Sequence, residues 1–335
     1  MRNSKDNIFT GDTNQGNPYI GDFERGINYD SYEASFFLID QVGNFPQLSQ
    51  VYKTGSKRLV DRLNLKEGNV VLDIGSGTGI STLEIFQRQP NIQVIGVEIS
   101  EGMFLTSLYK FNKSDGKSLL NKLNNERLLT YWQEFRKKTI SHKNKVNFIN
   151  KDFQEIELEP RTIDNAVANQ VMHWMDLHKA FNQLDICLKQ DGELIWSTSS
   201  HFYNDKGFPS LEYGFRYNDF VKYVLDEVNK DVKVVGNYLD MARPKHDIDS
   251  LNKIALEYGF IVEQIATYLI PVDLQIFIQN HIPAFVRELS DKEKSVDEIN
   301  SIVKQAISRT IVNPNSLKDI KHKYDINPIF RTRRV

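Results

Sequence analysis

The chain has 335 residues, of which 40% are hydrophobic and 26% are charged, and this composition is typical of a soluble globular protein. Its formal net charge of -2 excludes a global attraction to nucleic acid or to anionic membranes, so such a partner would have to bind a local patch. The one cysteine, Cys187, excludes a disulfide framework and a cysteine-based metal site. It favours a reducing, cytoplasmic location, and no metal site is expected.

The first 26 residues are polar and lack the apolar core of a signal peptide, so they predict a flexible lead-in. No run of about 18 apolar residues occurs in the chain, so no membrane span is expected. The sequence contains no internal repeat. Nothing in it predicts an oligomeric state.

From residue 69 onward, short apolar runs alternate with longer stretches of helical pattern. This alternation predicts a parallel β-sheet flanked by helices. The predicted strands are 69–75, 92–98, 146–152, 163–169, 192–199, 260–270 and 326–335.

Three stretches are longer than an ordinary connection between strands. The first, 103–145, has apolar residues at helical spacing and holds ten Lys or Arg against three Asp or Glu over 104–145, so it predicts an inserted amphipathic helical element. The others are 201–245 and 272–322, and insertions at one edge of a sheet tend to form a lid. The basic face of the first insertion is expected to be solvated, although an acidic peptide, nucleic acid or a membrane surface would also suit its charge.

The stretch "VVLDIGSGTGIST", residues 70–82, places glycines at 75, 77 and 79 directly after the first predicted strand. A dinucleotide-binding loop reads G-x-G-x-x-G, but Ile80 occupies the position of its last glycine. Asp73 stands two residues before the first glycine, where a carboxylate repels a phosphate and suits a cationic ligand. A Walker loop is excluded because no G-K-[ST] follows.

Glu98 ends the second predicted strand, where a carboxylate can accept both hydroxyl groups of a ribose. Together with Asp73, it predicts a ligand that is a nucleoside without phosphates and with a positively charged tail. S-adenosylmethionine fits that description.

Five motifs follow one another between residues 69 and 199: "LDIGSGTG", "GVEIS", "NKDFQEI", "NQVMHWMD" and "LKQDGELIWST". In this order they resemble the class I S-adenosylmethionine-dependent methyltransferases. The resemblance implies an α/β fold with a Rossmann-like, seven-stranded, mostly parallel sheet, helices on both faces and a helical lid built from the insertions. It divides the chain into a polar lead-in and helical cap (1–60), a cofactor-binding core with its insertion (61–200), and lid insertions with the final core strands (201–335).

The resemblance also implies a set of cofactor-binding residues. In the loop, Asp73 and the first two glycines would approach the methionine part of the cofactor. Glu98 would bind the ribose, Asp152 would accept the adenine amino group, and Asn169 would present its backbone near the cofactor's amino group. The full set is Asp73, Gly75, Ser76, Gly77, Glu98, Ile99, Asp152, Phe153 and Asn169, with Ile99 and Phe153 against the adenine. The ordinary alternatives are a tight turn for the glycines and helix N-caps for Glu98 and Asp152.

The stretch "NQVMHWMD" after the fourth predicted strand is expected to face the methyl acceptor. It lacks the Pro-Pro-aromatic and Pro-Cys motifs of nucleic-acid methyltransferases. It resembles small-molecule methyltransferases, including those that esterify trans-aconitate, juvenile hormone acid or malonyl-carrier thioesters. In that group the tryptophan equivalent to Trp174 can donate its indole N–H to the acceptor carboxylate. His173 would serve as a general base or would pack on the cofactor.

The favoured function is therefore O-methylation of a carboxylate, on a small-molecule or short peptide-like acceptor, by in-line displacement with Trp174 and His173 positioning the acceptor. Further candidates for substrate contact are Tyr29, Tyr32, His201, Tyr213, Arg216 and His281. The alternatives are a C- or N-methyltransferase of a specialised metabolite with His173 as base, and a non-catalytic module that binds the cofactor and a partner. Nucleic-acid modification through the basic insertion is less favoured.

Overall fold

The computed structural model describes Asp30 and residues 51–121, 126–198, 226–231, 246–272 and 323–335, together with single positions that include Tyr203 and several between 298 and 309. The strands are β1 (Val70–Ile74), β2 (Gln93–Val97), β3 (Val146–Ile149), β4 (Ile163–Asn169), β5 (Leu188–Ser197), β6 (Phe260–Val272) and β7 (Lys323–Arg334). The α-helices are α2 (Val51–Val60), α3 (Ile80–Arg88), α4 (Glu101–Lys110), α5 (Lys117–Leu120), α6 (Glu126–Thr139), α7 (Leu177–Cys187) and α9 (Ile248–Leu256). The short 3-10 helices are η2 (Ile140–His142), η3 (Phe153–Glu155) and η4 (Met172–Trp174).

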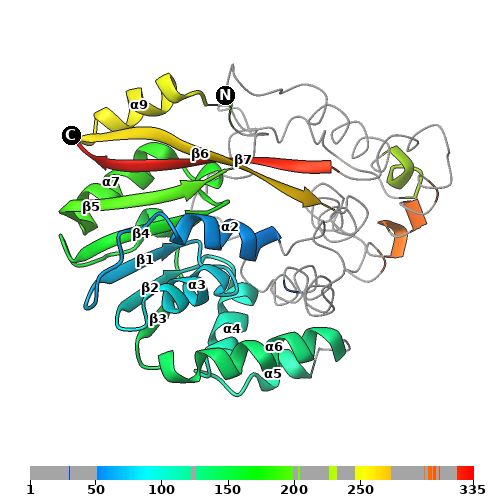
Figure 1. Ribbon diagram of the computed structural model, residues 1–335. Helices are drawn as coiled ribbons and strands as arrows, with labels where there is room; N and C mark the ends of the chain where they lie inside the picture. Colours follow the sequence, from blue (N-terminus) through cyan, green and yellow to red (C-terminus); the bar gives the residue numbers. More distant parts are fainter. Residues whose placement is uncertain are drawn as a thin grey trace.

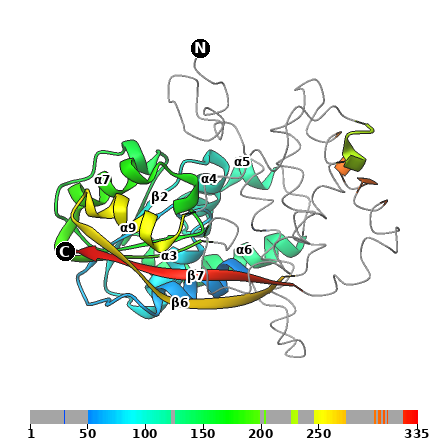
Figure 2. The same ribbon diagram turned by 90° about the horizontal axis from the view of Figure 1, so that it is seen from above.

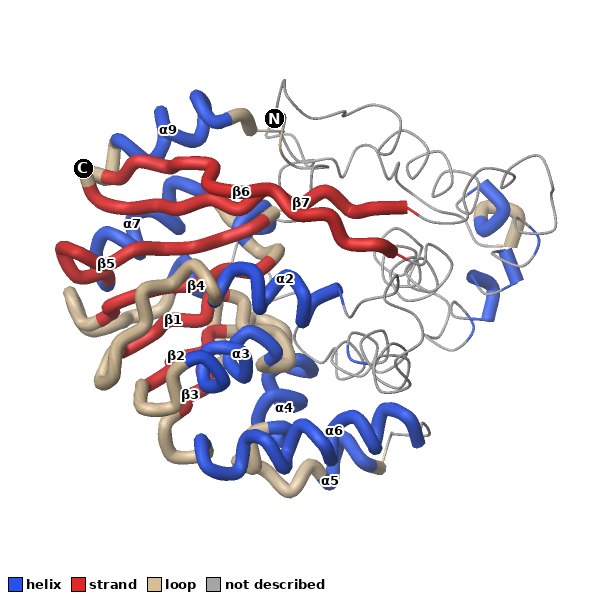
Figure 3. The backbone as a smooth tube through the Cα atoms, in the orientation of Figure 1, coloured by secondary structure: helices blue, strands red, loops and turns tan. Residues whose placement is uncertain are grey.

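The seven strands form one sheet in the order β3-β2-β1-β4-β5-β7-β6 (Figures 1 and 3). The first five strands run parallel, and β7 lies antiparallel between β5 and β6. This confirms the predicted α/β, seven-stranded, mostly parallel sheet. Because β1 lies between β2 and β4, the residues that follow these three strands meet at the centre of the carboxyl edge.

Helices cover both faces of the sheet, with α7 and α9 on one side and α2 on the other (Figure 2). The alternation of side chains along β1 explains why both faces are apolar. Val71 packs into the core on the side of α2, α3 and α6, whereas Leu72 packs into the core on the side of α7 and α9. Both side chains are fully buried, so the sheet is held firmly enough to fix the loops at its edge.

Strand β5 begins at Leu188, four residues before the predicted start at 192, so that predicted boundary was wrong. The polar run Lys189-Gln190-Asp191 has the composition of a turn, yet the chain already pairs with β4 through Ile163 and Leu188. A bulge absorbs these polar residues, because the next paired residues are Asn165 and Glu193.

The predicted helical insertion at 103–145 consists of α4, α5 and α6, followed by η2, and it lies along the edge of the sheet beyond β3 (Figure 1). Its apolar stripe is buried as predicted: Leu119, Leu128, Trp132 and Phe135 are all at most 4% exposed. Two further apolar residues have this helical spacing: Leu120 is partly exposed, and Leu123 lies outside the described residues. Helix α4 begins at Glu101, two residues before the predicted insertion, because the Ser100 side chain caps it by accepting from the Met103 N–H.

The two predicted lid insertions, 201–245 and 272–322, lie mostly outside the described residues, as does nearly all of the lead-in 1–50. Tyr203 is one described position, and it pairs with His246 in an isolated bridge and packs edge-on against Phe330. Among the described helices, none is both long enough and apolar enough to cross a bilayer.

Candidate functional site

The glycine loop, residues 75–79, connects β1 to α3 at the carboxyl edge of the sheet. Gly75 has φ +61°, and a side-chain carbon there would approach Val171 Cγ2 to 2.4 Å, so glycine is required by both backbone and packing. Gly77 also has a positive φ of +54°, but the nearest atom to a side-chain carbon there would be Met103 Sδ at 3.8 Å. The loop is therefore packed tightly against the β4–η4 connection at Gly75, whereas a side-chain carbon at Gly77 would make only ordinary van der Waals contact.

Asp73 lies in β1 just before this loop and is 1% exposed. One carboxylate oxygen, Oδ2, accepts from the Thr82 hydroxyl at 2.6 Å. The other, Oδ1, is buried and has no hydrogen-bond partner among the described residues, and the same holds for Ser76 Oγ. Burial raises the pKa of Asp73 to about 7, and the nearby charge of Glu98 adds to the rise. A cation beside this carboxylate would supply both the missing partner and the missing charge.

Glu98 follows β2 and is also buried, at 6% exposed. Its Oε2 accepts from the Gly77 N–H at 2.8 Å and its Oε1 accepts from the Ser100 N–H at 2.8 Å, so it holds the glycine loop in place. The N-cap of α4 is Ser100, so the alternative of Glu98 as a helix cap was wrong. A carboxylate has about four acceptor positions, so these two hydrogen bonds do not by themselves exclude further donors.

Asn150, a residue that the sequence analysis missed, supports the segment after β2. Its amide donates to the carbonyl oxygen of Glu98 at 2.7 Å and to that of Ile99 at 3.1 Å. Ile99 is partly exposed next to Glu98. No signal in the sequence pointed to this role, because Asn150 lies inside the predicted strand 146–152, whereas β3 ends at Ile149.

Asp152 and Phe153 lie at the start of η3, beyond β3. Asp152 caps η3 by accepting from the Gln154 N–H at 2.9 Å, so the alternative of a helix cap holds for this residue. The Gln154 side-chain amide also donates to both Asp152 oxygens, at 3.1 and 3.0 Å. Phe153 is 2% exposed and packs in the core on the side of α7. The contacts of both residues with adenine stay predictions.

The acceptor candidates lie in η4, after β4. His173 Nδ1 lies 3.0 Å from the Thr198 hydroxyl, and the His173 and Trp174 rings are 5.0 Å apart and tilted by 48°. Both side chains are partly exposed. The turn that carries them is unusual, because Gln170 has φ +60°, a left-handed conformation that non-glycine residues rarely adopt and that is often found at functional sites.

A chain of polar side chains that the sequence analysis missed crosses the carboxyl edge behind these residues. Asn169 donates to Ser56 Oγ at 3.0 Å and accepts from the Ser197 hydroxyl at 3.0 Å, and Ser56 contacts Ser81 at 2.8 Å. Gln170 donates to Asn327 of β7. Since the Asn169 side chain is used within the protein, only its backbone is left for the predicted contact with the cofactor's amino group.

Six predicted substrate contacts lie outside the described residues: Tyr29, Tyr32, His201, Tyr213, Arg216 and His281. Cys187, in contrast, is described, and it is 1% exposed with a pKa raised to about 12 by burial, which makes it an unreactive core residue.

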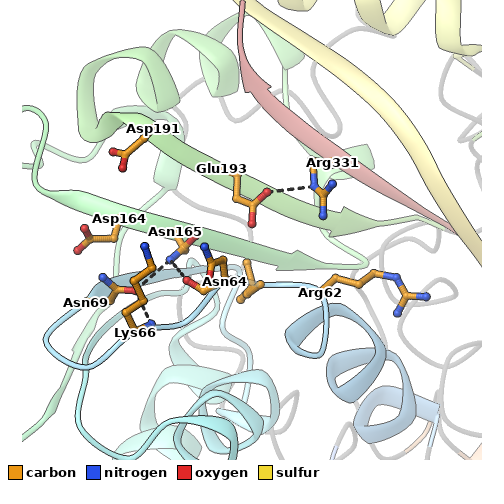
Figure 4. A pocket seen from close by; sticks show the side chains of 10 residues that line it. Arg62, Asn64, Lys66, Asn69, Asp164, Asn165, Asp191, Glu193 and Arg331 are labelled. Carbon is orange, nitrogen blue, oxygen red and sulfur yellow. Dashed lines mark hydrogen bonds and ion pairs between the residues drawn. The ribbon is translucent and has the colours of Figure 1, made fainter.

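A cavity of about 470 Å³ lies at the opposite, amino-terminal edge of β1, β4 and β5 (Figure 4). It is lined by Arg62, Leu63, Asn64, Lys66, Asn69, Asp164, Asn165, Asp191, Glu193 and Arg331. Glu193 and Arg331 point toward each other and form an ion pair at 3.0 Å. In open α/β sheets, ligands bind at the carboxyl ends of the strands, so this cavity is not the predicted site.

Residues 47–230 match the family model described as a methyltransferase domain. This match covers more than half of the chain, and the chain therefore belongs to the methyltransferase-domain family. The predicted enzyme class and the predicted cofactor, S-adenosylmethionine, are those of this family.

Two curated relatives illustrate the match. A malonyl-[acyl-carrier protein] O-methyltransferase of Acetivibrio thermocellus is 27% identical over 161 residues, which cover 47% of this chain and 46% of that protein. The probable S-adenosylmethionine-dependent methyltransferase CRG1 of Saccharomyces cerevisiae is 27% identical over 192 residues, covering 56% and 49%. The chain thus matches about half the length of each relative, and the activity of the whole protein is a matter for proposal.

Among solved structures, the [4+2]-cyclase SpnF is 13% identical with a TM-score of 0.51, and the match covers 94% of this chain and 95% of that one. At this identity the likeness shows the fold alone. That protein is named as a cyclase, so the fold does not define the reaction.

Proposed function

We propose that this protein transfers the methyl group of S-adenosylmethionine to a carboxylate oxygen of a small-molecule, short peptide-like or carrier-bound acceptor. The observation that carries the cofactor part is the buried oxygen of Asp73 that has no hydrogen-bond partner among the described residues, at the end of β1 next to the glycine loop. The predicted acceptor residues follow β4, the strand next to β1, and Val171 of the same connection packs against the glycine loop.

The chain's own groups fit the parts of the cofactor. Asp73 and Ser76 would accept from its ammonium group, because each has a buried oxygen with no hydrogen-bond partner among the described residues. Glu98 would accept from the ribose hydroxyls while it keeps its bond to Gly77. When bound, the cofactor supplies an electrophilic methyl group, and the protein needs only to hold the acceptor in line with it and to exclude water.

A carboxylate acceptor suits the geometry of η4. It is already ionised at neutral pH, so it needs orientation and no general base. The indole N–H of Trp174 is a donor only, and a donor is what a carboxylate requires. Thr198 holds the His173 ring beside Trp174 through Nδ1. If the Thr198 hydroxyl donates to Nδ1, then Nε2 carries the proton and His173 is a second donor.

The same contact gives the second candidate its basis. If His173 Nδ1–H donates to Thr198 instead, then Nε2 is an acceptor and His173 can serve as a general base. That tautomer suits methylation of a nitrogen or carbon that must lose a proton. The two candidates therefore differ in which His173 nitrogen carries the hydrogen.

The test uses S-adenosylmethionine with a tritiated methyl group and, as acceptors, a panel of short mono- and dicarboxylic acids and malonyl-acyl-carrier protein. Methyl esters hydrolyse in alkali and release volatile tritiated methanol, whereas N- and C-methyl groups do not. We expect label that becomes volatile in alkali. Stable label would support the N- or C-methyl alternative, and S-adenosylmethionine binding without transfer to any acceptor would support the non-catalytic module.

A further inference from the structure

Asp30 comes from the N-terminal part of the chain, yet its side chain is fully buried against residues far along the sequence. Its Oδ1 accepts from the Thr78 hydroxyl at 2.6 Å. Its Oδ2 accepts from Lys110 Nζ at 2.8 Å and from the Trp132 indole N–H at 2.6 Å. These three donors are separated from Asp30 by 48, 80 and 102 residues, so a single carboxylate connects distant parts of the chain.

The three donors come from different elements. Thr78 lies inside the glycine loop, between Gly77 and Gly79, and is 1% exposed. Lys110 ends α4 and Trp132 lies in α6, so both belong to the basic insertion 103–145. Asp30 therefore joins the N-terminal part of the chain and the insertion to the loop that lies at the predicted cofactor site.

The Lys110 ammonium group is buried within the cluster formed by Asp30, Thr78 and Trp132. Lys110 is fully buried, and its Nζ also donates to Thr78 Oγ1 at 3.1 Å and lies 4.0 Å from the centre of the Phe135 ring. A buried ion pair contributes little net stability, because desolvation of both charges offsets their attraction. What such a pair does define is geometry, since short charge-assisted hydrogen bonds tolerate few arrangements.

We propose that Asp30 is a positioning residue for the cofactor loop. By holding the Thr78 hydroxyl it sets the backbone of the neighbouring Gly77, whose N–H donates to Glu98, the predicted ribose-binding residue. The insertion holds the Asp30 carboxylate in place through the hydrogen bonds from Lys110 and Trp132. The inference rests on the proposed function, because it concerns the same cofactor site.

The experiment separates positioning from stability with a charge-compensated pair. Asp30→Asn and Lys110→Met each leave one buried charge unpaired and should each lower the melting temperature. The double variant has neither charge and should recover most of the melting temperature. We expect its dissociation constant for S-adenosylhomocysteine, measured by calorimetry, to stay about tenfold above that of the wild type, because Thr78 has lost a charged acceptor.

Thr78→Val gives a second, milder test that leaves the ion pair in place. Thr106→Val is the matched control, because Thr106 is also fully buried, but its hydroxyl donates to Gly102 O within α4. We expect weaker S-adenosylhomocysteine binding and faster hydrogen exchange of residues 75–79 in Thr78→Val only. Recovery of wild-type affinity in the double variant, or equal effects of the two threonine variants, would overturn the inference.

The failure of the proposed function is distinguishable from the failure of this inference. If the wild type binds no S-adenosylhomocysteine, the proposed function fails. Hydrogen exchange of residues 75–79 in the free protein then decides the inference by itself. Faster exchange in the double variant than in the wild type supports the positioning role of Asp30, and equal exchange contradicts it.

Discussion

The two edges of the parallel strands differ in whether their carboxylates are paired with a cationic side chain among the described residues. At the amino edge, which holds the cavity of about 470 Å³, Glu193 pairs with Arg331 and Asp164 accepts from the Val70 N–H and from Lys189, each at 2.7 Å. At the carboxyl edge, Asp73 keeps one buried oxygen without a partner among the described residues. The contrast teaches that a buried carboxylate without a cationic partner among the described residues marks this site better than the size of a cavity does.

The largest expected effect on cofactor binding comes from Asp73→Asn. The substitution keeps the shape and removes the charge that would face the cofactor's cationic groups. We expect the dissociation constant for S-adenosylmethionine to rise about a hundredfold or more, which corresponds to ~3 kcal/mol. Isothermal calorimetry measures it, and an effect of less than about threefold would contradict the assignment.

The same variant should stabilise the free protein. Because the folded-state pKa is raised from 3.8 to about 7, ionisation of Asp73 destabilises the fold increasingly between those pH values, and the cost stays constant above pH 7. We expect Asp73→Asn to melt at a higher temperature than the wild type at pH 8, and the difference to shrink toward pH 4. A lower melting temperature at pH 8 would mean that the buried charge has a partner in the protein.

Glu98→Gln should come next, with Glu193→Gln as its counterpart at the amino edge. Loss of the Glu98 charge weakens its hydrogen bonds to the Gly77 N–H and to the ribose, so we expect S-adenosylmethionine to bind about thirtyfold more weakly, or ~2 kcal/mol. Glu193→Gln should change the affinity by less than about twofold, because it lies at the other end of the strands. Equal effects from the two variants would remove the contrast between the edges.

Cofactor affinity should also depend on pH. A bound cation lowers the pKa of Asp73, so binding requires the ionised form of a group that is about half protonated at pH 7 in the free protein. We expect the affinity of the wild type to fall about tenfold between pH 8 and pH 6. Titrations at several pH values should show this fall only where Asp73 is present, and the same slope in Asp73→Asn would assign it to another group.

The smallest effect is expected on the acceptor side. Trp174→Phe keeps the ring and removes the indole N–H, so kcat/KM for a carboxylate acceptor should fall about fivefold while the cofactor's dissociation constant stays the same. A carboxylate acceptor also predicts no fall in rate from protonation of His173. If Trp174→Phe instead raises the dissociation constant for the cofactor, Trp174 contacts the cofactor and not the acceptor.

The sequence was sufficient for the sheet, because each of the seven strands contains a short apolar run that alternates with stretches of helical or polar pattern. The start of β5 was missed because the polar run 189–191 is absorbed in a bulge, which requires knowledge of the partner strand. In the site, Asp73 and Glu98 were visible from their places after strands. The role of Glu98 within the protein was not visible: the sequence allowed Glu98 to cap a helix, whereas Ser100 caps α4.

The Asp30 cluster could not be predicted from the sequence. Its members lie 48 to 102 residues apart, and each alone has an ordinary explanation: Lys110 as one of many lysines in a basic stretch, Trp132 as part of an apolar stripe. Only the packing of α4 and α6 beside the glycine loop brings them together. A buried polar cluster depends on tertiary contacts, and no periodicity in the sequence reports it.

The central claim is that the buried Asp73 carboxylate receives a cationic cofactor, and proton release tests it most directly. S-adenosylmethionine is titrated by calorimetry at pH 7 in buffers of different ionisation enthalpy. The same titration of Asp73→Asn, at a higher cofactor concentration, measures the protons that the cofactor's own amino group releases on binding. This number is subtracted from the wild-type value. A pKa of about 7 in the free protein predicts that the wild type releases about half a proton more than the variant. Binding with equal proton release in both proteins would contradict the claim.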